Sequence, residues 1–316
     1  MAFGRESTIN NMLYSFILLA LILSISHGFA FTSPLQQIAT AMKSYQDEML
    51  SEQSSWKQPP HLAVLTEPDA CDSIQRVNET YRAIEQATLD GNVDLVVVRI
   101  TDDSMSLPKE RNQKNANKLE LLQRLSRLKS TREKDSMAFK LIINNDIEMA
   151  IAALSQSIPI DGMHVKERNI ESITSIRQQL QNAAVKSGLN NVILMGTSCH
   201  SVKSAMDSHE LVDYLFVGTC YLTRSHPEKN QDQLEGPQFP SRIKEELARI
   251  IPNSLSAIPI IFAIGGIDET NCHEPVLYGA DGVGVIRSIM KAADPRSMSK
   301  CIKKSISDAR GKIENE

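Results

Sequence analysis

The sequence lacks the cysteine pattern of a disulfide scaffold or a structural zinc site. Its 316 residues include five scattered cysteines, an odd number with no Cys-x-x-Cys pair among them. This argues against both kinds of site and favours a reducing final compartment.

An excess of charge of either sign is also missing. Lysine and arginine number 34 against 38 aspartates and glutamates, a formal net charge of −4. Nucleic-acid-binding domains usually carry a basic patch, so this balance predicts no nucleic-acid partner. The length and the apolar content of 41% suit one soluble barrel domain.

One long apolar run stands near the N-terminus, at residues 13–25, with Arg5 before it. The run is short for a transmembrane helix but suits the core of a signal peptide. Gly28 and Ala30 supply the small residues that a signal peptidase reads. We therefore expect a signal peptide at residues 1–30.

Residues 31–58 are expected to be a transit-like segment followed by a linker. The stretch to Met42 has hydroxyl residues and no acidic residue, as transit peptides do. The junction at residues 28–34 resembles the bipartite targeting signal of algae with secondary plastids, in which a phenylalanine follows the cut. This predicts a plastid location, which also explains free cysteines behind a secretory signal. Ordinary secretion or a membrane anchor is the alternative.

Strand-length apolar segments alternate with helical segments through residues 59–310. The alternation predicts an α/β fold, a (β/α)8 TIM barrel, with its site at the C-terminal ends of the strands. The fold alone does not define the reaction. The expected strands are residues 61–66, 94–100, 139–144, 161–165, 192–195, 213–217, 258–264 and 281–286.

The last two strand–helix units carry the pattern most typical of phosphate binding. The strand at 258–264 runs into Gly265 and Gly266, which allow a sharp turn and bring backbone N–H groups close to a ligand. The last strand leads into a basic and polar turn, and phosphate usually sits at these two units. A tight turn without a ligand is the alternative for the glycines, and a helix is expected at 268–278. The residues of the last turn are Ile286, Arg287 and Ser288.

Other strand ends carry further candidates for substrate binding. Arg99 ends an apolar strand, where a charge must either be paired within the barrel mouth or face a ligand. Asn144 ends the third strand. The loop after the sixth strand has hydroxyls and basic groups that suit a phosphate or pyrophosphate, or else forms a solvated turn and possible lid. Its candidates are Thr223, Arg224, Ser225 and His226.

Ser198 and His200 follow the expected fifth strand and are the candidates for catalysis. An imidazole exchanges protons near neutral pH, which suits an acid/base role, whereas capping of the next helix is the alternative for His200. His164 lies on an alternating strand and is expected to be structural. Cys199 is expected to point away from the site.

These motifs together, from about residue 61 to 295, resemble the thiamine phosphate synthase/TenI family of barrel proteins. Asp161-Gly-Met-His164 is similar to the Asp-Gly-Val-His of the family, and Gly196-Thr-Ser-Cys-His200 to its Gly-x-Ser-x-His. Residues 263–267 and 279–282 match its Ala-Ile-Gly-Gly-Ile and Gly-Ala-Asp-Gly motifs. The Asp213-Tyr, Gly218 and Thr223-Arg-Ser225 positions match its sixth strand and the loop that follows.

The resemblance implies a thiazole phosphate as ligand. It also implies the reaction of the synthase, in which thiazole phosphate attacks a pyrimidine carbocation formed as magnesium-bound pyrophosphate leaves, a chemistry that needs carboxylates for the metal. Arg287 stands where the family usually has serine. The residues implied to hold the thiazole phosphate are Thr223, Ser225, Gly266, Ile286 and Arg287.

The sequence departs from the synthase at the positions that the resemblance assigns to magnesium and diphosphate. Asn145 replaces the aspartate after the third strand, and Asn169 the aspartate after the fourth. Of the Gln-Leu-Arg-Glu-Lys stretch on the second strand only Arg99 remains, and His226 replaces a lysine. Asp146 and Glu167 are the carboxylates that a shift in register could offer instead.

The TenI branch of the family lacks the same groups, and its resemblance implies a thiazole tautomerase. Such an enzyme moves a proton on thiazole carboxylate phosphate, forms the aromatic isomer and needs no metal. The histidine of its Ser-x-His motif corresponds to His200, so we expect His200 to act as acid/base with Ser198 nearby. No cofactor is expected.

Two alternatives remain open. One is a divergent, magnesium-dependent synthase that joins hydroxymethylpyrimidine diphosphate to thiazole phosphate. The other is a non-catalytic protein that binds thiazole phosphate or thiamine phosphate. The expected partners are therefore small molecules, and a homo-oligomer is compatible with the sequence.

Overall fold

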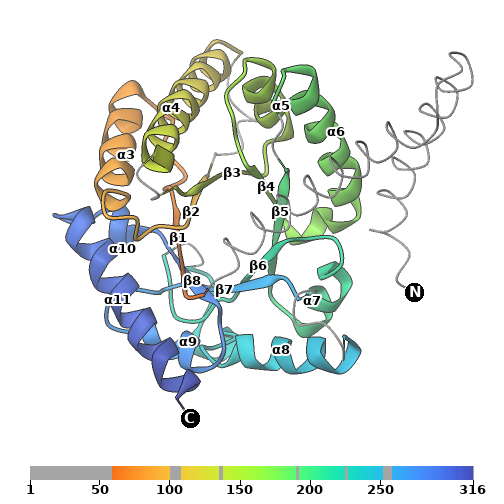
Figure 1. Ribbon diagram of the computed structural model, residues 1–316, viewed down its shortest axis with the longest axis vertical. Coiled ribbons are helices and arrows are strands. Elements are labelled where there is room, and N and C mark those ends of the chain that lie inside the picture. The colour runs from red at the N-terminus through yellow and green to blue at the C-terminus, as the bar shows by residue number, and fades with distance from the viewer. Residues whose placement is uncertain are drawn as a thin grey trace, which may run out of the picture. The chain divides into compact units, whose positions relative to one another are not determined.

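The computed structural model describes residues 59–99, 108–134, 138–189, 192–224, 227–251 and 258–315. The expected targeting segment and linker at 1–58 lie outside these ranges, as do Ser225 and His226. Eight parallel strands form a closed barrel in sequence order, and β8 pairs with β1 (Figure 1). The predicted TIM barrel is confirmed. The strands are β1 His61–Leu65, β2 Leu95–Val98, β3 Lys140–Asn144, β4 Gly162–Val165, β5 Leu194–Cys199, β6 Tyr214–Val217, β7 Ile260–Ile264 and β8 Gly282–Val285.

Helices surround the barrel (Figure 1). Buried apolar side chains of these helices and of the strands form one core cluster. In α4 the side chain of Leu121 is fully buried, whereas that of Leu119 is only partly buried. The α-helices are α3 Ile74–Ala87, α4 Pro108–Lys134, α5 Ile147–Ser155, α6 Ile173–Lys186, α7 Val202–Ser208, α8 Phe239–Ile250, α9 His273–Leu277, α10 Arg287–Met290 and α11 Pro295–Glu314, and the 3-10 turns are η1 Glu167–Ser172 and η2 Gln231–Gln233.

Several element boundaries differ from the sequence prediction, most clearly those of β5, α9 and α11. Strand β5 continues to Cys199, because residues 196–199 pair with β6, so Ser198 lies within the strand rather than after it. Helix α9 begins only at His273, because Asp268 accepts hydrogen bonds from the N–H and hydroxyl of Thr270 and forms a turn first. The last helix continues to Glu314, past the expected barrel end at residue 310.

Aromatic rings fill the barrel below the ends of the strands. The ring centroids of His164 and Phe216 are 4.7 Å apart, and those of Phe216 and Phe262 are 5.5 Å apart. Tyr214 joins them, and a Cβ at Gly196 would lie 2.0 Å from its ring. The glycine of the Gly-x-Ser-x-His motif therefore makes room for an aromatic side chain beneath the site.

At the opposite end of the barrel, an aspartate precedes each even-numbered strand and ties it to the strand before. Each carboxylate accepts the backbone N–H of a residue in the preceding strand and pairs with a cation from a helix. We call these four pairs the aspartate clamps. Fixing strand pairing at this end stabilises a barrel without touching its site. The clamps are Asp94 with Lys303, Asp161 with Lys129, Asp213 with Arg177, and Asp281 with Lys244.

In the part of the chain that the structure describes, no helix combines the length and the apolarity that a membrane span requires. The described cysteines form no disulfide: Cys71, Cys199, Cys220 and Cys272 are buried, and Cys301 is exposed. Burial raises the pKa of Cys199 to about 11, so this thiol is protonated at neutral pH and unsuited to act as a nucleophile.

Candidate functional site

A cavity of about 650 Å³ opens at the C-terminal ends of the strands. Side chains alternate along a strand, so one inward position near the end of each strand reaches this space. All eight strands therefore contribute to one wall or floor of the cavity. These inward residues are Leu65, Arg99, Asn144, His164, Ser198, Phe216, Ile264 and Gly284.

Positive charge predominates in the cavity lining. Five cationic side chains face two carboxylates, those of Glu167 and Asp268, although the whole chain carries a net charge of −4. This excess favours an anionic ligand. The cationic residues are Arg99, Lys166, Arg168, Arg224 and Arg287.

Arg99 is a half-buried cation at the end of β2. Its backbone N–H donates to Thr66 Oγ1 at 2.8 Å, which fixes the end of β2 against β1. Burial and the charge of Arg287 lower the pKa of Arg99, and within the described ranges no side chain pairs with its guanidinium. A structural ion pair, which is one of the two interpretations of Arg99, is therefore not observed among these residues. A buried charge without a protein partner is stabilised when an anionic ligand binds beside it.

Gly265 and Gly266 join the turn after β7 to the loop after β6. Both have positive φ, 98° and 65°, and a Cβ on Gly266 would lie 2.5 Å from the carbonyl oxygen of Leu222. The N–H of Tyr221 donates to the carbonyl of Gly265 at 3.0 Å. The paired glycines thus allow close packing of two loops, which brings Thr223 into the same cavity.

Ile286, Arg287 and Ser288 complete this side of the cavity from the turn after β8. Ser288 donates its hydroxyl to the carbonyl of Ile267 at 2.8 Å. Its hydroxyl proton is thus used within the fold and ties the β8 turn to the β7 turn. The three adjacent segments form one continuous wall.

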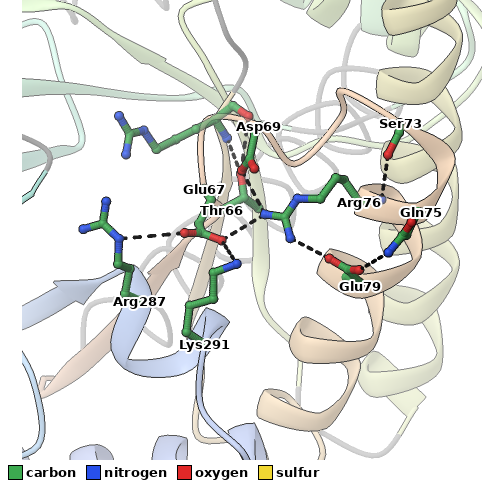
Figure 2. A network of polar contacts seen from close by, with 10 residues as sticks. Thr66, Glu67, Asp69, Ser73, Gln75, Arg76, Glu79, Arg287 and Lys291 are labelled. Atoms are coloured by element: carbon green, nitrogen blue, oxygen red, sulfur yellow. Dashed lines mark hydrogen bonds and ion pairs between the residues drawn. The ribbon is translucent and has the colours of Figure 1, made fainter.

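Glu67, at the end of β1, connects Arg287 to the outer helices. Its carboxylate lies between three cations: Arg76 at 2.9 Å, Lys291 at 2.7 Å and Arg287 at 3.8 Å (Figure 2). Arg76 also pairs with Asp69 at 2.9 Å. The longer distance to Arg287 leaves this guanidinium, which is 39% exposed, able to turn toward a ligand.

Ser198 is hydrogen-bonded to His164 and not to His200. The distance between His164 Nε2 and Ser198 Oγ is 2.9 Å. Burial, helped by the charge of Arg99, lowers the pKa of His164 to about 3. His164 is therefore neutral at physiological pH and can either donate to the serine or accept from it. The structural role expected for His164 is thus combined with direct contact to a cavity hydroxyl.

His200 lies at the rim of the cavity, with its side chain 37% exposed. Its Nδ1 is hydrogen-bonded to the backbone carbonyl of Gly218. A carbonyl only accepts, so Nδ1 carries the proton, and in the neutral ring Nε2 is the nitrogen that can take up a proton. The N-cap of α7 is Ser201, so the helix-capping alternative for His200 does not hold.

The positions that the synthase resemblance assigns to magnesium do not fit a metal. Asn169 Nδ2 donates to Asn145 Oδ1 at 3.4 Å, and the N–H of Lys166 donates to the same oxygen at 3.3 Å. Asp146 caps α5 by accepting the N–H of Met149 at 2.9 Å. Among the described residues, no group of three or more His, Cys, Asp or Glu side chains could hold a metal ion.

The structure brings together every predicted site residue that it describes. Arg99, Asn144, Ser198 and His200 meet residues from the other side of the barrel across one cavity, because all stand at strand ends. Sequence reasoning missed Glu67, Lys166, Arg168 and the loop residue Glu235. Lys166 and Arg168 follow β4, so the rule that found the other residues could have found them. The predicted residues on the side of the cavity opposite Arg99, Asn144, Ser198 and His200 are Thr223, Arg224, Gly265, Gly266, Ile286, Arg287 and Ser288.

Comparisons with known proteins point to one family. Residues 64–289 match the family model described as thiamine monophosphate synthase. The chain is 31% identical over 169 residues to a thiamine-phosphate synthase of Geobacillus thermodenitrificans, and the matched stretch covers 53% of this chain and 64% of that protein. A thiamine-phosphate synthase of Listeria innocua is 35% identical over 164 residues, 51% of this chain and 64% of that protein.

Solved structures share the fold at lower identity. Thiamine phosphate pyrophosphorylase from Pyrococcus furiosus superposes with a TM-score of 0.53 at 21% identity, over 80% of this chain and 98% of that one. The tryptophan synthase alpha subunit of Legionella pneumophila gives 0.51 at 12% identity, over 84% and 98%. At these identities the likeness concerns the barrel and not the reaction.

Proposed function

Because the chain belongs to the thiamine monophosphate synthase family, we propose that it acts in thiamine biosynthesis as a metal-independent thiazole tautomerase. The substrate proposed is thiazole carboxylate phosphate, and the product is its aromatic isomer. The sequence matches cover just under two thirds of the synthase relatives, so their activity is a starting point for this chain and not a property of it.

The observation that carries the proposal is the amide pair of Asn145 and Asn169. Carboxylate oxygens are the protein ligands that magnesium prefers, and a neutral amide supplies far less charge to the ion. Here two amides stand where the resemblance to the synthase implies two carboxylates, and they are hydrogen-bonded to each other. A reaction that has to neutralise a departing pyrophosphate is poorly served by this pair, whereas a proton transfer does not need the metal.

The cavity offers a place for each part of the proposed substrate. We expect its phosphate at the wall made by Gly266 and Arg287, where two turns from adjacent strands meet. Its carboxylate suits the guanidinium of Arg99, which a carboxylate can contact through two parallel hydrogen bonds. We then expect the apolar ring over Leu65 and Phe216, which line the cavity together with Ser198 and His200.

His200 would move the proton. Its Nε2 takes a proton from one carbon of the substrate, and a proton is returned at another carbon, so substrate and product have the same composition. When His164 is in its Nε2–H tautomer, it donates to Ser198 Oγ, and the hydroxyl proton of Ser198 can then be donated to the negative charge that forms between the two steps. A positioned acid/base typically accelerates such a step about 10²–10⁴-fold.

The second candidate is a magnesium-dependent synthase. The names of the relatives favour it, and the Glu167 carboxylate on the cavity wall offers one oxygen ligand. This candidate requires Glu167 and the pyrimidine diphosphate itself to hold the metal without the two carboxylates. The synthase needs the pyrimidine diphosphate as a second substrate and is inhibited by a chelator, whereas the tautomerase needs one substrate and is unaffected by a chelator.

One assay separates these functions. The full-length chain is given the non-aromatic thiazole carboxylate phosphate with EDTA, and separately with magnesium and hydroxymethylpyrimidine diphosphate. Aromatic isomer formed in EDTA supports the tautomerase, whereas thiamine phosphate formed only with magnesium supports the synthase. Binding of the thiazole phosphate without either product identifies a binding protein and contradicts the proposal.

A further inference from the structure

The peptide unit between Gly218 and Thr219 connects His200 to a glutamate that lies 35 residues further along the chain. The carbonyl of this peptide accepts the hydrogen bond of His200 Nδ1. The N–H of the same peptide donates to the carboxylate of Glu235. Histidine, peptide and carboxylate thus form a continuous chain of hydrogen bonds.

This arrangement affects the imidazole in two ways. A hydrogen bond to the N–H of a peptide polarises its carbonyl, which then becomes a stronger acceptor for the Nδ1–H of His200. The charge of Glu235 also acts directly, because its Oε1 lies 3.9 Å from His200 Nδ1. Both effects favour a proton on Nδ1 and thus the Nδ1–H tautomer of the neutral ring.

Glu235 is itself held firmly and remains ionised. Lys229 donates to its two oxygens at 2.9 and 3.0 Å, and the N–H of Glu235 donates to the carbonyl of Thr219 at 3.1 Å. Burial acts to raise the pKa of Glu235, but the hydrogen bonds from Lys229 and Thr219 outweigh it and leave the pKa below its usual value. The carboxylate is 14% exposed.

The peptide unit is fixed on its other side by β7. The N–H of Cys220 donates to the carbonyl of Ile264 at 2.9 Å, and a Cβ on Gly218 would lie 2.1 Å from that same oxygen. The carbonyl that binds His200 therefore cannot turn away without breaking the packing of the loop against the strand. The packing of this loop against β7 thus fixes the geometry of the hydrogen-bond chain from His200 to Glu235.

We propose that Glu235 is a positioning residue that keeps His200 in the Nδ1–H tautomer and leaves Nε2 to accept the substrate proton. Its link to catalysis rests on the proposed function, whereas its effect on the tautomer does not. The role resembles that of any third group that orients a general base. Here the carboxylate acts largely through a backbone peptide.

The test is the tautomeric state of His200, read from the ¹⁵N chemical shifts of its imidazole in the full-length chain. The signal is assigned by its loss in His200→Gln. In the native protein and in Glu235→Gln, whose amide oxygen can still accept the N–H of Thr219, we expect the Nδ1–H tautomer. In Glu235→Ala we expect the Nε2–H tautomer to gain population. Asp232→Ala, an exposed change in the same loop, is the matched control and should leave the signal unchanged.

Kinetics supply the second readout. For Glu235→Ala we expect kcat for isomerisation to fall about tenfold or more while KM changes by no more than about twofold, with partial recovery in Glu235→Gln. An unchanged His200 tautomer in Glu235→Ala would overturn the proposal. If the tautomer shifts but the native protein catalyses no isomerisation, the positioning role stands and the proposed function fails.

Discussion

At the scale of single residues, His164 links the stability of the barrel to the polarity of its site. A histidine in an unfolded chain has a pKa near 6.5, whereas burial and Arg99 lower the pKa of His164 to about 3 in the folded protein. Between these values the unfolded chain binds a proton that the folded protein excludes. The contribution to stability is therefore fully present above about pH 6.5 and is lost as the pH falls toward 3.

Replacing His164 with phenylalanine should remove this dependence. We expect the free energy of unfolding to decrease less steeply from pH 6.5 to pH 4 in His164→Phe than in the native protein, as measured by urea unfolding at each pH. Ser198→Ala is the control, because it keeps the buried imidazole and should keep the slope. Equal slopes in His164→Phe and the native protein would show that His164 does not titrate as described.

The amide pair leads to a second prediction at this scale. Replacing both Asn145 and Asn169 with aspartate places two like charges side by side, which should destabilise the protein until a cation binds. Magnesium should therefore raise the unfolding temperature of the double variant and leave that of the native protein nearly unchanged. A clear magnesium-dependent rise in the native protein would contradict our account of these positions.

At the scale of elements, the turn after β7 depends on its second glycine. In Gly266→Ala the new Cβ meets the Leu222 carbonyl and the backbone keeps a positive φ, so both strain and a clash result. Gly188 also has a positive φ, 71°, but apart from Gly188 itself and its two chain neighbours no described residue has an atom within 4 Å of the position that a new methyl group would take. Gly188→Ala therefore isolates the strain alone, for which about 1–2 kcal/mol is expected.

We therefore expect Gly266→Ala to lower the free energy of unfolding more than Gly188→Ala does, and to weaken binding of a thiazole phosphate. Gly188→Ala should leave that binding unchanged. Urea unfolding and isothermal titration calorimetry measure the two effects. Equal losses of stability in the two variants would mean that the packing of this turn against the β6 loop contributes little.

The contrast between Ser198 and Glu235 shows which parts of the site could be predicted from the sequence. Ser198, His200, Gly265 and Arg287 stand at the ends of regular strands, and alternation alone brings such positions together. Glu235 lies in a long loop without a period, and its contact with the Gly218–Thr219 peptide depends on how that loop folds back. No local pattern specifies such a contact.

Helix and strand boundaries show the same limit. The extent of β5 depends on its pairing with β6, and the late start of α9 depends on the turn formed by Asp268 and Thr270. Apolar runs predicted both elements, since their existence follows from burial. Their ends are decided by hydrogen bonds to residues that a run of apolar side chains does not reveal.

At the scale of the whole molecule, the aspartate clamps close the end of the barrel opposite the site. Their four cations differ in burial, which provides an internal comparison. The side chain of Lys129 is 9% exposed, and burial acts to lower its pKa, but the charges and hydrogen bonds of Asp161 and Glu133 together outweigh burial and leave the pKa raised. Lys244, the partner of Asp281, is 29% exposed.

Removing the buried charge should therefore cost more stability. In Asp161→Asn the ammonium of Lys129 loses its closest partner, and we expect a loss of about 3 kcal/mol, as for a broken buried ion pair. Asp281→Asn, with its more exposed lysine, should cost clearly less. Thermal unfolding of both variants measures this order, and isomerisation in the folded variants should be unaffected. A larger loss of stability in Asp281→Asn than in Asp161→Asn would contradict burial of the lysine as the cause of the difference.

The central claim is that this barrel isomerises a thiazole phosphate without a metal. The most direct measurement follows, by ¹H NMR with the full-length chain in EDTA, the conversion of the non-aromatic thiazole carboxylate phosphate into its aromatic isomer. We predict that the aromatic isomer appears faster than in buffer, that His200→Ala removes this acceleration, and that His209→Ala, which changes a histidine outside the cavity, retains it. The claim would be contradicted if the native protein gave no acceleration in EDTA but, with magnesium present, formed thiamine phosphate from the thiazole phosphate and the pyrimidine diphosphate.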